Sequence, residues 1–157
     1  MTYPAWLPDL FPVDPWQHDT YEELYYLFEQ DFKASQATYA GQYVWFFTDI
    51  EDGKEKIFWH LTSRKIDNAD DRLPDLRRCE RLPWVRPMID QPGKPDVLAW
   101  DHEEGDGSIK TYVWLEDFDF VVIMKKYHNG GRRLITSFWV EYKNAKKKLK
   151  KKYGRRV

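Results

Sequence analysis

Residues 60–65, HLTSRK, place an imidazole, two hydroxyl groups and two cations within six consecutive positions. An imidazole titrates near neutral pH, so His60 can act as an acid or a base, and the guanidinium of Arg64 can hold two phosphate oxygens at once. This set of side chains suits the handling of a phosphodiester. A structural alternative also fits the sequence, with Thr62 or Ser63 as a helix N-cap and His60 as a partly buried side chain.

A second polar segment, RRLITSFW at residues 132–139, follows the almost purely apolar segment FVVIM. Successive side chains of a strand point to opposite faces, which places Arg133 on one face and both Arg132 and Thr136 on the other. Neither face is apolar throughout, so the sheet must accommodate polar side chains. A shared site for Arg133 and Thr136 would need a β-bulge, or Arg132 would have to take the place of Arg133.

Three further arginines, Arg77, Arg78 and Arg81, follow at helical spacing. If their helix covers one side of the sheet, they converge with the polar segments described above. Cleavage of RNA without a metal ion needs a base for the 2′-hydroxyl, an acid for the leaving 5′-oxygen and cations for the charge that develops on phosphorus. The chain offers each type. The alternative is that the arginines form a solvated helix face and that Thr136 is an ordinary strand residue.

Metal-ligating residues do not form a known motif in this chain. The four histidines lack the spacings HxxxH, HExxH and HxH, and Cys79 is the only cysteine. The turn HNGGRR matches neither of the glycine-rich motifs that bind nucleotide phosphates. We therefore expect no metal ion and no cofactor, and a structural role for Cys79.

Charge is distributed unevenly along the 157 residues, although the net charge is only −1. Residues 1–71 carry 5 Lys/Arg against 14 Asp/Glu, residues 72–140 carry 11 of each, and residues 141–157 carry 9 Lys/Arg against 1 Asp/Glu. The basic C-terminus would attract a polyanion such as nucleic acid. It is equally typical of a solubilising helix that frays.

The length and the composition, 42% hydrophobic and 32% charged, suit one globular domain. No run approaches the roughly 20 apolar residues of a membrane helix. The start, MTYPAWLPDLFPVDPW, lacks the basic and apolar regions of a signal peptide. We therefore expect a cytoplasmic protein without membrane contact.

The elements that must position the polar segments begin with an extended arm. Residues 1–19 contain four prolines, and we expect Trp6, Phe11 and Trp16 to dock on the body. Residues 20–35 have apolar side chains at helical spacing and predict an amphipathic helix. QYVWFFTDI and EKIFWHLTSR, on either side of the turn EDGK, predict a β-hairpin whose second strand contains His60.

The second half of the chain predicts a sheet. Residues 72–89 predict a short helix that ends near Pro83, with irregular chain up to Pro87. The segments DVLAWDH, SIKTYVWLED, FDFVVIMKKY and RRLITSFWVEY then predict four strands of an antiparallel meander. The lysine-rich end predicts a basic helix. The predicted organisation is a proline-rich arm (1–19), a single α+β domain (20–142) in which N-terminal helices pack on a curved meander, and a basic tail (143–157).

Four segments, FWHLTSRKI, RLPDLRRCERLPWVRPMI, KTYVWLEDFDFVVIMKK and RRLITSFWVEY, resemble the Barnase-EndoU-ColicinE5/D-RelE-like (BECR) nuclease superfamily, in particular its phage- and mobile-element-associated branches. The resemblance covers roughly residues 57–142. It implies helices that precede a four-stranded antiparallel meander. It also implies a metal-independent ribonuclease that serves as a toxin or in conflict between phage and host.

By this resemblance the catalytic candidates are His60, Arg64, Arg133 and Thr136. His60 would be the acid or base, the two arginines would stabilise charge, and Thr136 would orient the phosphate, so that attack by the 2′-hydroxyl leaves a 2′,3′-cyclic phosphate. Contacts with RNA are expected from basic side chains of the helix, the late strand and the tail: Arg77, Arg78, Arg81, Arg132, Lys146, Lys147, Lys150 and Lys151. The expected partners are RNA, with tRNA as a candidate, and an antitoxin or a host protein.

Two alternatives remain open. The domain could bind RNA or single-stranded DNA without cutting it. It could also be a phage-type interaction or inhibitor domain, whose acidic N-terminal half and exposed tryptophans contact a protein partner.

Overall fold

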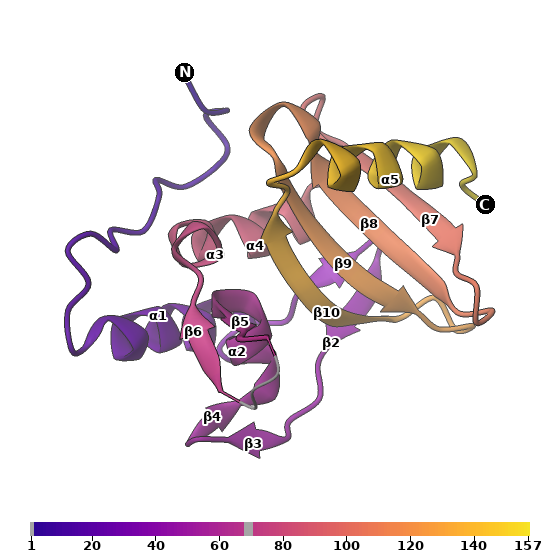
Figure 1. Cartoon of the computed structure of the whole chain (residues 1–157). Helices are drawn as coiled ribbons and strands as arrows, with labels where there is room; N and C mark the ends of the chain where they lie inside the picture. Colours follow the sequence, from indigo (N-terminus) through magenta and orange to yellow (C-terminus); the bar gives the residue numbers. More distant parts are fainter. Residues whose placement is uncertain (1, 68–70) are drawn as a thin grey trace.

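A computed structural model describes residues 2–67 and 71–157, and it has the predicted α+β architecture (Figure 1). The main sheet has six strands in the order β1-β2-β10-β9-β8-β7. Their bounds are β1 (Thr38–Tyr39), β2 (Gln42–Trp45), β7 (Leu98–Glu103), β8 (Ile109–Leu115), β9 (Phe120–Lys126) and β10 (Arg132–Trp139). Strands β7 to β10 pair antiparallel in chain order, which confirms the predicted meander; the short 3-10 turn η2 (Glu116–Phe118) joins β8 to β9.

Strand β2 lies parallel to β10 and extends the sheet beyond the meander. The parallel pairing joins only Arg132 to Val44 and Arg133 to Trp45, so the rest of β10 has no strand on that side among the described residues. Helices α2 (Lys56–Thr62) and α3 (Leu76–Glu80) contact β10 instead. This edge of β10 is where the N-terminal helices meet the sheet.

The helix predicted over residues 20–35 is confirmed as α1 (Thr20–Phe28), which continues as one π-helical turn, η1 (Glu29–Lys33). The β-hairpin predicted after it is confirmed only next to its turn. The strands that flank the Asp-Gly turn are only two residues long, β3 (Ile50–Glu51) and β4 (Lys54–Glu55), and the chain then forms α2. Ile57, Phe58 and Leu61 are buried at helical spacing, and Phe58 packs against aromatic rings of α1, so tertiary contacts override the strand preference of these residues.

Two short strands and two helices connect α2 to the meander. Strand β5 (Ser63–Lys65) pairs with β6 (Arg72–Pro74), and α3 follows directly. The short helix predicted before Pro83 is α3, which ends at Glu80, but the irregular chain expected up to Pro87 is wrong, because a second helix, α4 (Leu82–Asp90), begins there. Pro83 lies in the first turn of α4, where backbone N–H groups make no intrahelical hydrogen bond, so a proline loses none. Pro87 lies inside the helix.

The two faces of the sheet are covered by different elements. One face shares a core with the N-terminal helices, including Phe28, Phe58 and Trp84. The other face is covered by α5 (Lys143–Gly154), the predicted basic helix, whose Leu149 is buried against a second apolar cluster (Figure 1). Ala145 and Tyr153 also pack against this cluster, so α5 is docked on the sheet along its length.

The proline-rich arm packs on the body as predicted. Trp6, Phe11 and Trp16 are partly buried against the main core, and Trp6 Nε1 donates a hydrogen bond to Asp96.

Cys79 is buried, and its Sγ donates a hydrogen bond to the Thr62 carbonyl at 3.1 Å. Burial raises the pKa of this thiol to about 12. Within residues 2–67 and 71–157, no helix is long and apolar enough to cross a bilayer.

Candidate functional site

The site residues predicted on the late strand lie at a β-bulge. Arg133 pairs with Lys125 and Thr136 pairs with Ile123, so three positions on β10 match two positions on β9; the register shifts after Leu134. Arg133 and Thr136 therefore share a face of the sheet, although strict alternation would separate them. The β-bulge that a shared site for Arg133 and Thr136 requires is present.

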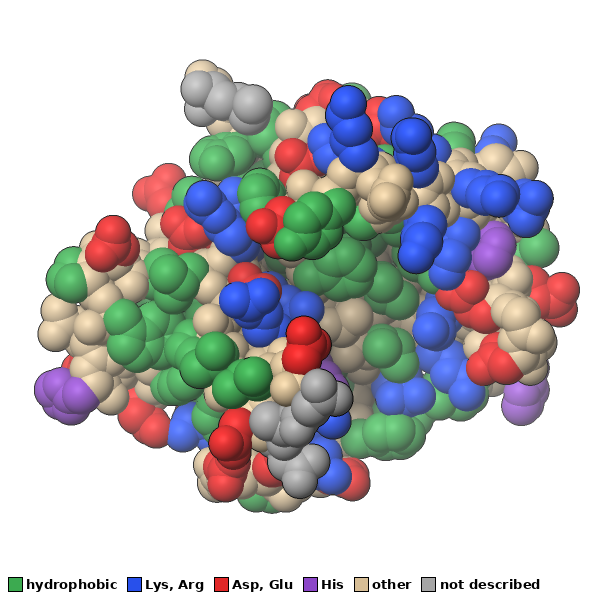
Figure 2. Space-filling model, in the orientation of Figure 1, with side chains coloured by type: hydrophobic (Ala, Val, Ile, Leu, Met, Phe, Trp, Pro, Cys, Tyr) green, Lys and Arg blue, Asp and Glu red, His purple; other side chains and the backbone are tan. Residues whose placement is uncertain are grey.

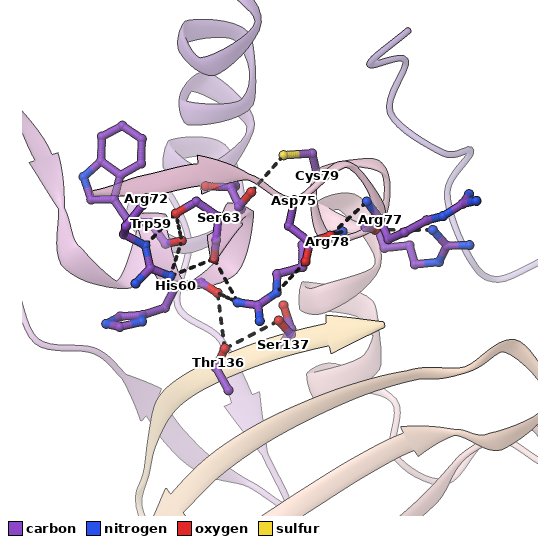
Figure 3. Close-up of polar contacts among 12 residues, drawn as sticks. Trp59, His60, Ser63, Arg72, Asp75, Arg77, Arg78, Cys79, Thr136 and Ser137 are labelled. Atoms are coloured by element: carbon purple, nitrogen blue, oxygen red, sulfur yellow. Dashed lines mark hydrogen bonds and ion pairs between the residues drawn. The ribbon is translucent and has the colours of Figure 1, made fainter. Parts of the chain in front are cut away.

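Helix α2 ends beside this bulge with carbonyl groups that lack helical partners. The His60 carbonyl accepts a hydrogen bond from Thr136 Oγ1 at 3.2 Å and another from Arg78 Nη1 at 2.9 Å, as Figure 3 shows. Arg78 Nη1 also donates to the Ser63 carbonyl at 2.9 Å. These bonds tie the end of α2 to β10 and to α3. They also occupy the Thr136 hydroxyl, which was predicted to orient a phosphate.

Arg72 of β6 secures the other side of the same helix end (Figure 3). Its Nε donates to Ser63 Oγ and its Nη2 to the Ser63 carbonyl, both at 2.7 Å. Ser63 Oγ in turn donates to the Trp59 carbonyl at 2.6 Å. A helix C-terminus carries partial negative charge, which favours two guanidinium groups at this place. The local fold thus gathers cations around His60.

A pocket of about 580 Å³ opens between α2, the β5–β6 pair and the free edge of β10. Figure 2 shows a hollow near the middle of this face of the molecule, with Lys and Arg side chains around it. The pocket is lined by Phe47, Asp49, Lys56, Ile57, His60, Arg64, Lys65, Arg72, Arg78, Arg133, Leu134, Ile135 and Thr136. Six of these are Lys or Arg and one is an acid, so in a chain of nearly zero net charge this pocket is strongly positive.

Five of the pocket cations are not in an ion pair with any described acid: Lys56, Arg64, Lys65, Arg72 and Arg133. Lys56, Arg64 and Lys65 are exposed, whereas Arg133 is half-buried. Five cations without described acidic partners around one cavity form a site for an anion with several charges, such as the phosphates of a nucleic acid.

His60 lies at the wall of this pocket on the last turn of α2. Partial burial, together with the positive charges of Arg72 and Arg78, holds its pKa below the usual value of 6.5. This lowered pKa favours the neutral imidazole, which is able to accept a proton.

Arg133 is held at the pocket by aromatic side chains. Its Nε donates to Tyr127 Oη at 3.1 Å, and its guanidinium lies 4.0 Å from the ring centre of Phe47 and 6.0 Å from that of Trp45. Stacking of this kind fixes the plane of a guanidinium without using an acid as partner. The charge of Arg133 therefore stays available to a ligand.

The other predicted arginines have different positions. Arg132 is buried in the core, where it pairs with Asp101 at 3.4 Å, so it is not accessible to a phosphate. Arg81 is also buried, with its guanidinium 5.2 Å from the ring centre of Trp84. Arg77 lies outside the pocket, stacked on Trp139 at 5.1 Å. Of the three helical arginines, Arg78 alone lines the pocket.

The predicted lysines of the tail lie on α5, over the face of the sheet that is covered by this helix (Figure 1). Lys147, Lys150 and Lys151 are exposed, and Lys146 pairs with Asp119. They form a second positive surface, separate from the residues that line the pocket.

Three pocket cations were not selected from the sequence: Lys56, Lys65 and Arg72. Lys65 stands inside the HLTSRK segment and could have been found there. Lys56 lies four positions before His60, which is one helical turn, but this signal appears only once the segment is known to be a helix.

Among the described residues, no group of three or more His, Cys, Asp or Glu side chains could hold a metal ion. Comparison of the chain with protein-family models, with curated protein sequences and with solved structures found no match.

Proposed function

We propose that the protein is an endoribonuclease that cleaves RNA through attack by the 2′-hydroxyl. The observation that carries this proposal is the position of His60 at the wall of a pocket that is lined by six Lys or Arg side chains. The resemblance of four sequence segments to BECR nucleases points to the same chemistry. RNA, with tRNA as a candidate, is the proposed substrate, and the cytoplasm is the proposed location.

In the proposed reaction, His60 accepts the proton of the 2′-hydroxyl while the 2′-oxygen forms a bond to phosphorus. The bond from phosphorus to the 5′-oxygen breaks, and that oxygen takes up a proton, for which the pocket offers the ammonium groups of Lys56 and Lys65. The products are a 2′,3′-cyclic phosphate and a 5′-hydroxyl. Arg64 and Arg133 stabilise the charge that develops on the phosphoryl oxygens. Thr136 is a positioning residue, because its hydroxyl holds the backbone of His60.

The test is incubation of the protein with total tRNA and with a labelled single-stranded RNA in EDTA, followed by analysis of the product ends. We expect the wild type to produce cyclic phosphate ends and His60→Gln to produce at least 100-fold less product, the size of a general acid–base contribution. His18→Gln is the matched control, since His18 is exposed on the arm. Cleavage by His60→Gln at the wild-type rate would refute the proposal.

A second candidate is a module that binds RNA without cutting it. This candidate is favoured by the Thr136 hydroxyl, which is already bonded to the His60 carbonyl, and by the absence of a second histidine among the residues that line the pocket. Binding without cleavage by the wild type, with affinity that falls as salt rises and is unchanged in His60→Gln, is the result that would select it. We also propose an antitoxin or a host protein as a further partner. This proposal follows from the resemblance to BECR nucleases alone.

A further inference from the structure

We propose that Trp45 and Phe47 form a base-stacking site beside the pocket, so that the ligand is an unpaired strand rather than a duplex. This inference rests on the proposed nucleic-acid function of the pocket. It adds the class of ligand, which the positive charge alone does not define, because phosphates attract cations in single and double strands alike.

The two rings are exposed although they are large and apolar. Trp45 is 39% exposed and Phe47 is 50% exposed, and their ring centres lie 5.6 Å apart in an edge-to-face arrangement. Tyr127 continues the group, with its ring centre 5.4 Å from that of Trp45. These three side chains, here called the aromatic cluster, lie at the end of β2, in the segment after it and directly after β9.

The fold fixes the aromatic cluster next to the pocket. Trp45 pairs with Arg133 across the parallel β2–β10 ladder, and Phe47 itself lines the pocket. Arg133 contacts all three members of the cluster, through the hydrogen bond to Tyr127 and through its position over both other rings. A phosphate bound by Arg133 would therefore lie close enough for an adjacent base to reach the exposed rings.

The chemistry of this arrangement is that of proteins that hold single strands. Such proteins combine a positive groove for the backbone with aromatic side chains on which bases stack. In a duplex the faces of the bases are already stacked on one another inside the helix, so an exposed ring on a protein surface has no base face to contact. An unpaired base has a free face. The cluster therefore adds affinity only for an unpaired strand.

The experiment measures binding by fluorescence anisotropy with His60→Gln as the background, so that the probe stays intact. Three labelled probes of one length are compared: a single-stranded RNA, a strand of the same backbone that lacks its bases, and the RNA annealed to its complement. Trp45→Leu and Phe47→Leu are tested singly and together, and Tyr26→Leu is the control, since Tyr26 is an exposed aromatic of α1 outside the cluster. Arg64→Gln reports on the phosphate site alone.

We expect the single-stranded RNA to bind most tightly, and each cluster variant to weaken its binding about 5- to 150-fold, the range known for loss of one stacked base. The cluster variants should weaken binding of the single-stranded RNA more than binding of the base-free strand, whereas a disturbance of Arg133 alone would weaken both to the same extent. Tyr26→Leu should have no effect on any probe.

The outcomes separate the two proposals. Binding that Arg64→Gln weakens, but that is equal for the single strand and the duplex and is unchanged in the cluster variants, would overturn the stacking site and leave the phosphate site intact. If Arg64→Gln binds every probe as the parent does, or if the parent binds none, both proposals fail. In that case, tight capture of a protein partner through Trp45 and Phe47 would become the interpretation of their exposure.

Discussion

The same substitution should affect different properties at the two neighbouring arginines of β10. Arg132 and Arg133 are adjacent in sequence, yet Arg132 is buried and bonded inside the protein whereas Arg133 lies at the pocket. Methionine keeps most of the side-chain length and removes the charge and the donors. Arg132→Met should therefore lower the stability of the fold, and Arg133→Met should instead lower the affinity for RNA.

The size of the stability loss follows from the contacts of Arg132. Its Nε donates to Thr111 Oγ1 at 2.8 Å, its Nη1 donates to the Gly130 carbonyl at 2.9 Å, and its Nη2 lies 3.4 Å from Asp101. Removal of one partner from a buried ion pair costs about 3–5 kcal/mol. Asp101 keeps Lys126 at 3.2 Å and the Thr111 hydroxyl at 2.6 Å, so we expect the lower end, about 3 kcal/mol.

Among the described residues, the side chain of Arg133 donates one hydrogen bond, to Tyr127, and its charge is not paired with an acid. Arg133→Met should therefore change the free energy of unfolding by less than about 1 kcal/mol. If Arg133 neutralises one phosphate, the slope of log affinity against log salt for a single strand should become less negative by about 0.7.

The assay is urea unfolding followed by tryptophan fluorescence, together with anisotropy titrations of a single-stranded RNA at three salt concentrations. Binding by Arg132→Met is measured at a temperature at which circular dichroism shows it to be folded, and its salt slope should equal that of the wild type. Equal free energies of unfolding for the two variants would refute this assignment of the arginines. So would a wild-type salt slope in Arg133→Met.

Three further predictions concern charge and packing elsewhere in the chain. Arg72→Gln should raise the pKa of His60, because partial burial and the charges of Arg72 and Arg78 depress it; an NMR titration of the His60 ring would show the change, and an unaltered pKa would contradict it. Asp31→Asn should stabilise the protein at pH 7.5 but hardly at pH 4, because burial raises the pKa of Asp31 from 3.8 to about 6 and the native state binds more protons than the unfolded state between these values. The stability of the wild type therefore falls as the pH rises through this window. Melting temperatures of the wild type and Asp31→Asn at pH 4 and pH 7.5 test this difference. An equal gain in melting temperature at both pH values would be inconsistent with it. Leu149→Ala should destabilise the protein by about 2–3 kcal/mol through loss of the buried contact of α5, whereas Lys150→Ala, at an exposed position of the same helix, should be neutral; urea unfolding compares the two.

The sequence allowed the sheet to be predicted better than the elements around it. The meander was predictable because its strands are apolar, are separated by clear turns and pair in chain order. The parallel pairing of β2 with β10 was not, because it joins residues that lie about 90 positions apart and leaves no local signal; Val44 pairs with Arg132 and Trp45 with Arg133. The burial of Arg132 depends on the same arrangement, since Tyr39 of β1 lies against its guanidinium.

The site was partly predictable from residue types. His60, Arg64, Arg133 and Thr136 were chosen because phosphate chemistry needs such groups, and all four line one pocket. The roles of these residues could not be predicted from residue types. That the Thr136 hydroxyl is bonded to the His60 carbonyl depends on where α2 ends relative to the bulge of β10, and neither position has a signature in the sequence.

The replacement of the expected strand by helix α2 explains why the cations converge on His60. In a continuous strand, the carbonyl groups of residues 59 and 60 would be directed at neighbouring strands. Near the end of a helix they remain open to side-chain donors, and here the carbonyls of Trp59 and His60 accept hydrogen bonds from Arg72, Arg78 and Thr136. The arginines that satisfy these carbonyls also depress the pKa of His60. The same helix end therefore supplies the positive charge that a phosphate requires and keeps the imidazole in the neutral form that a base requires.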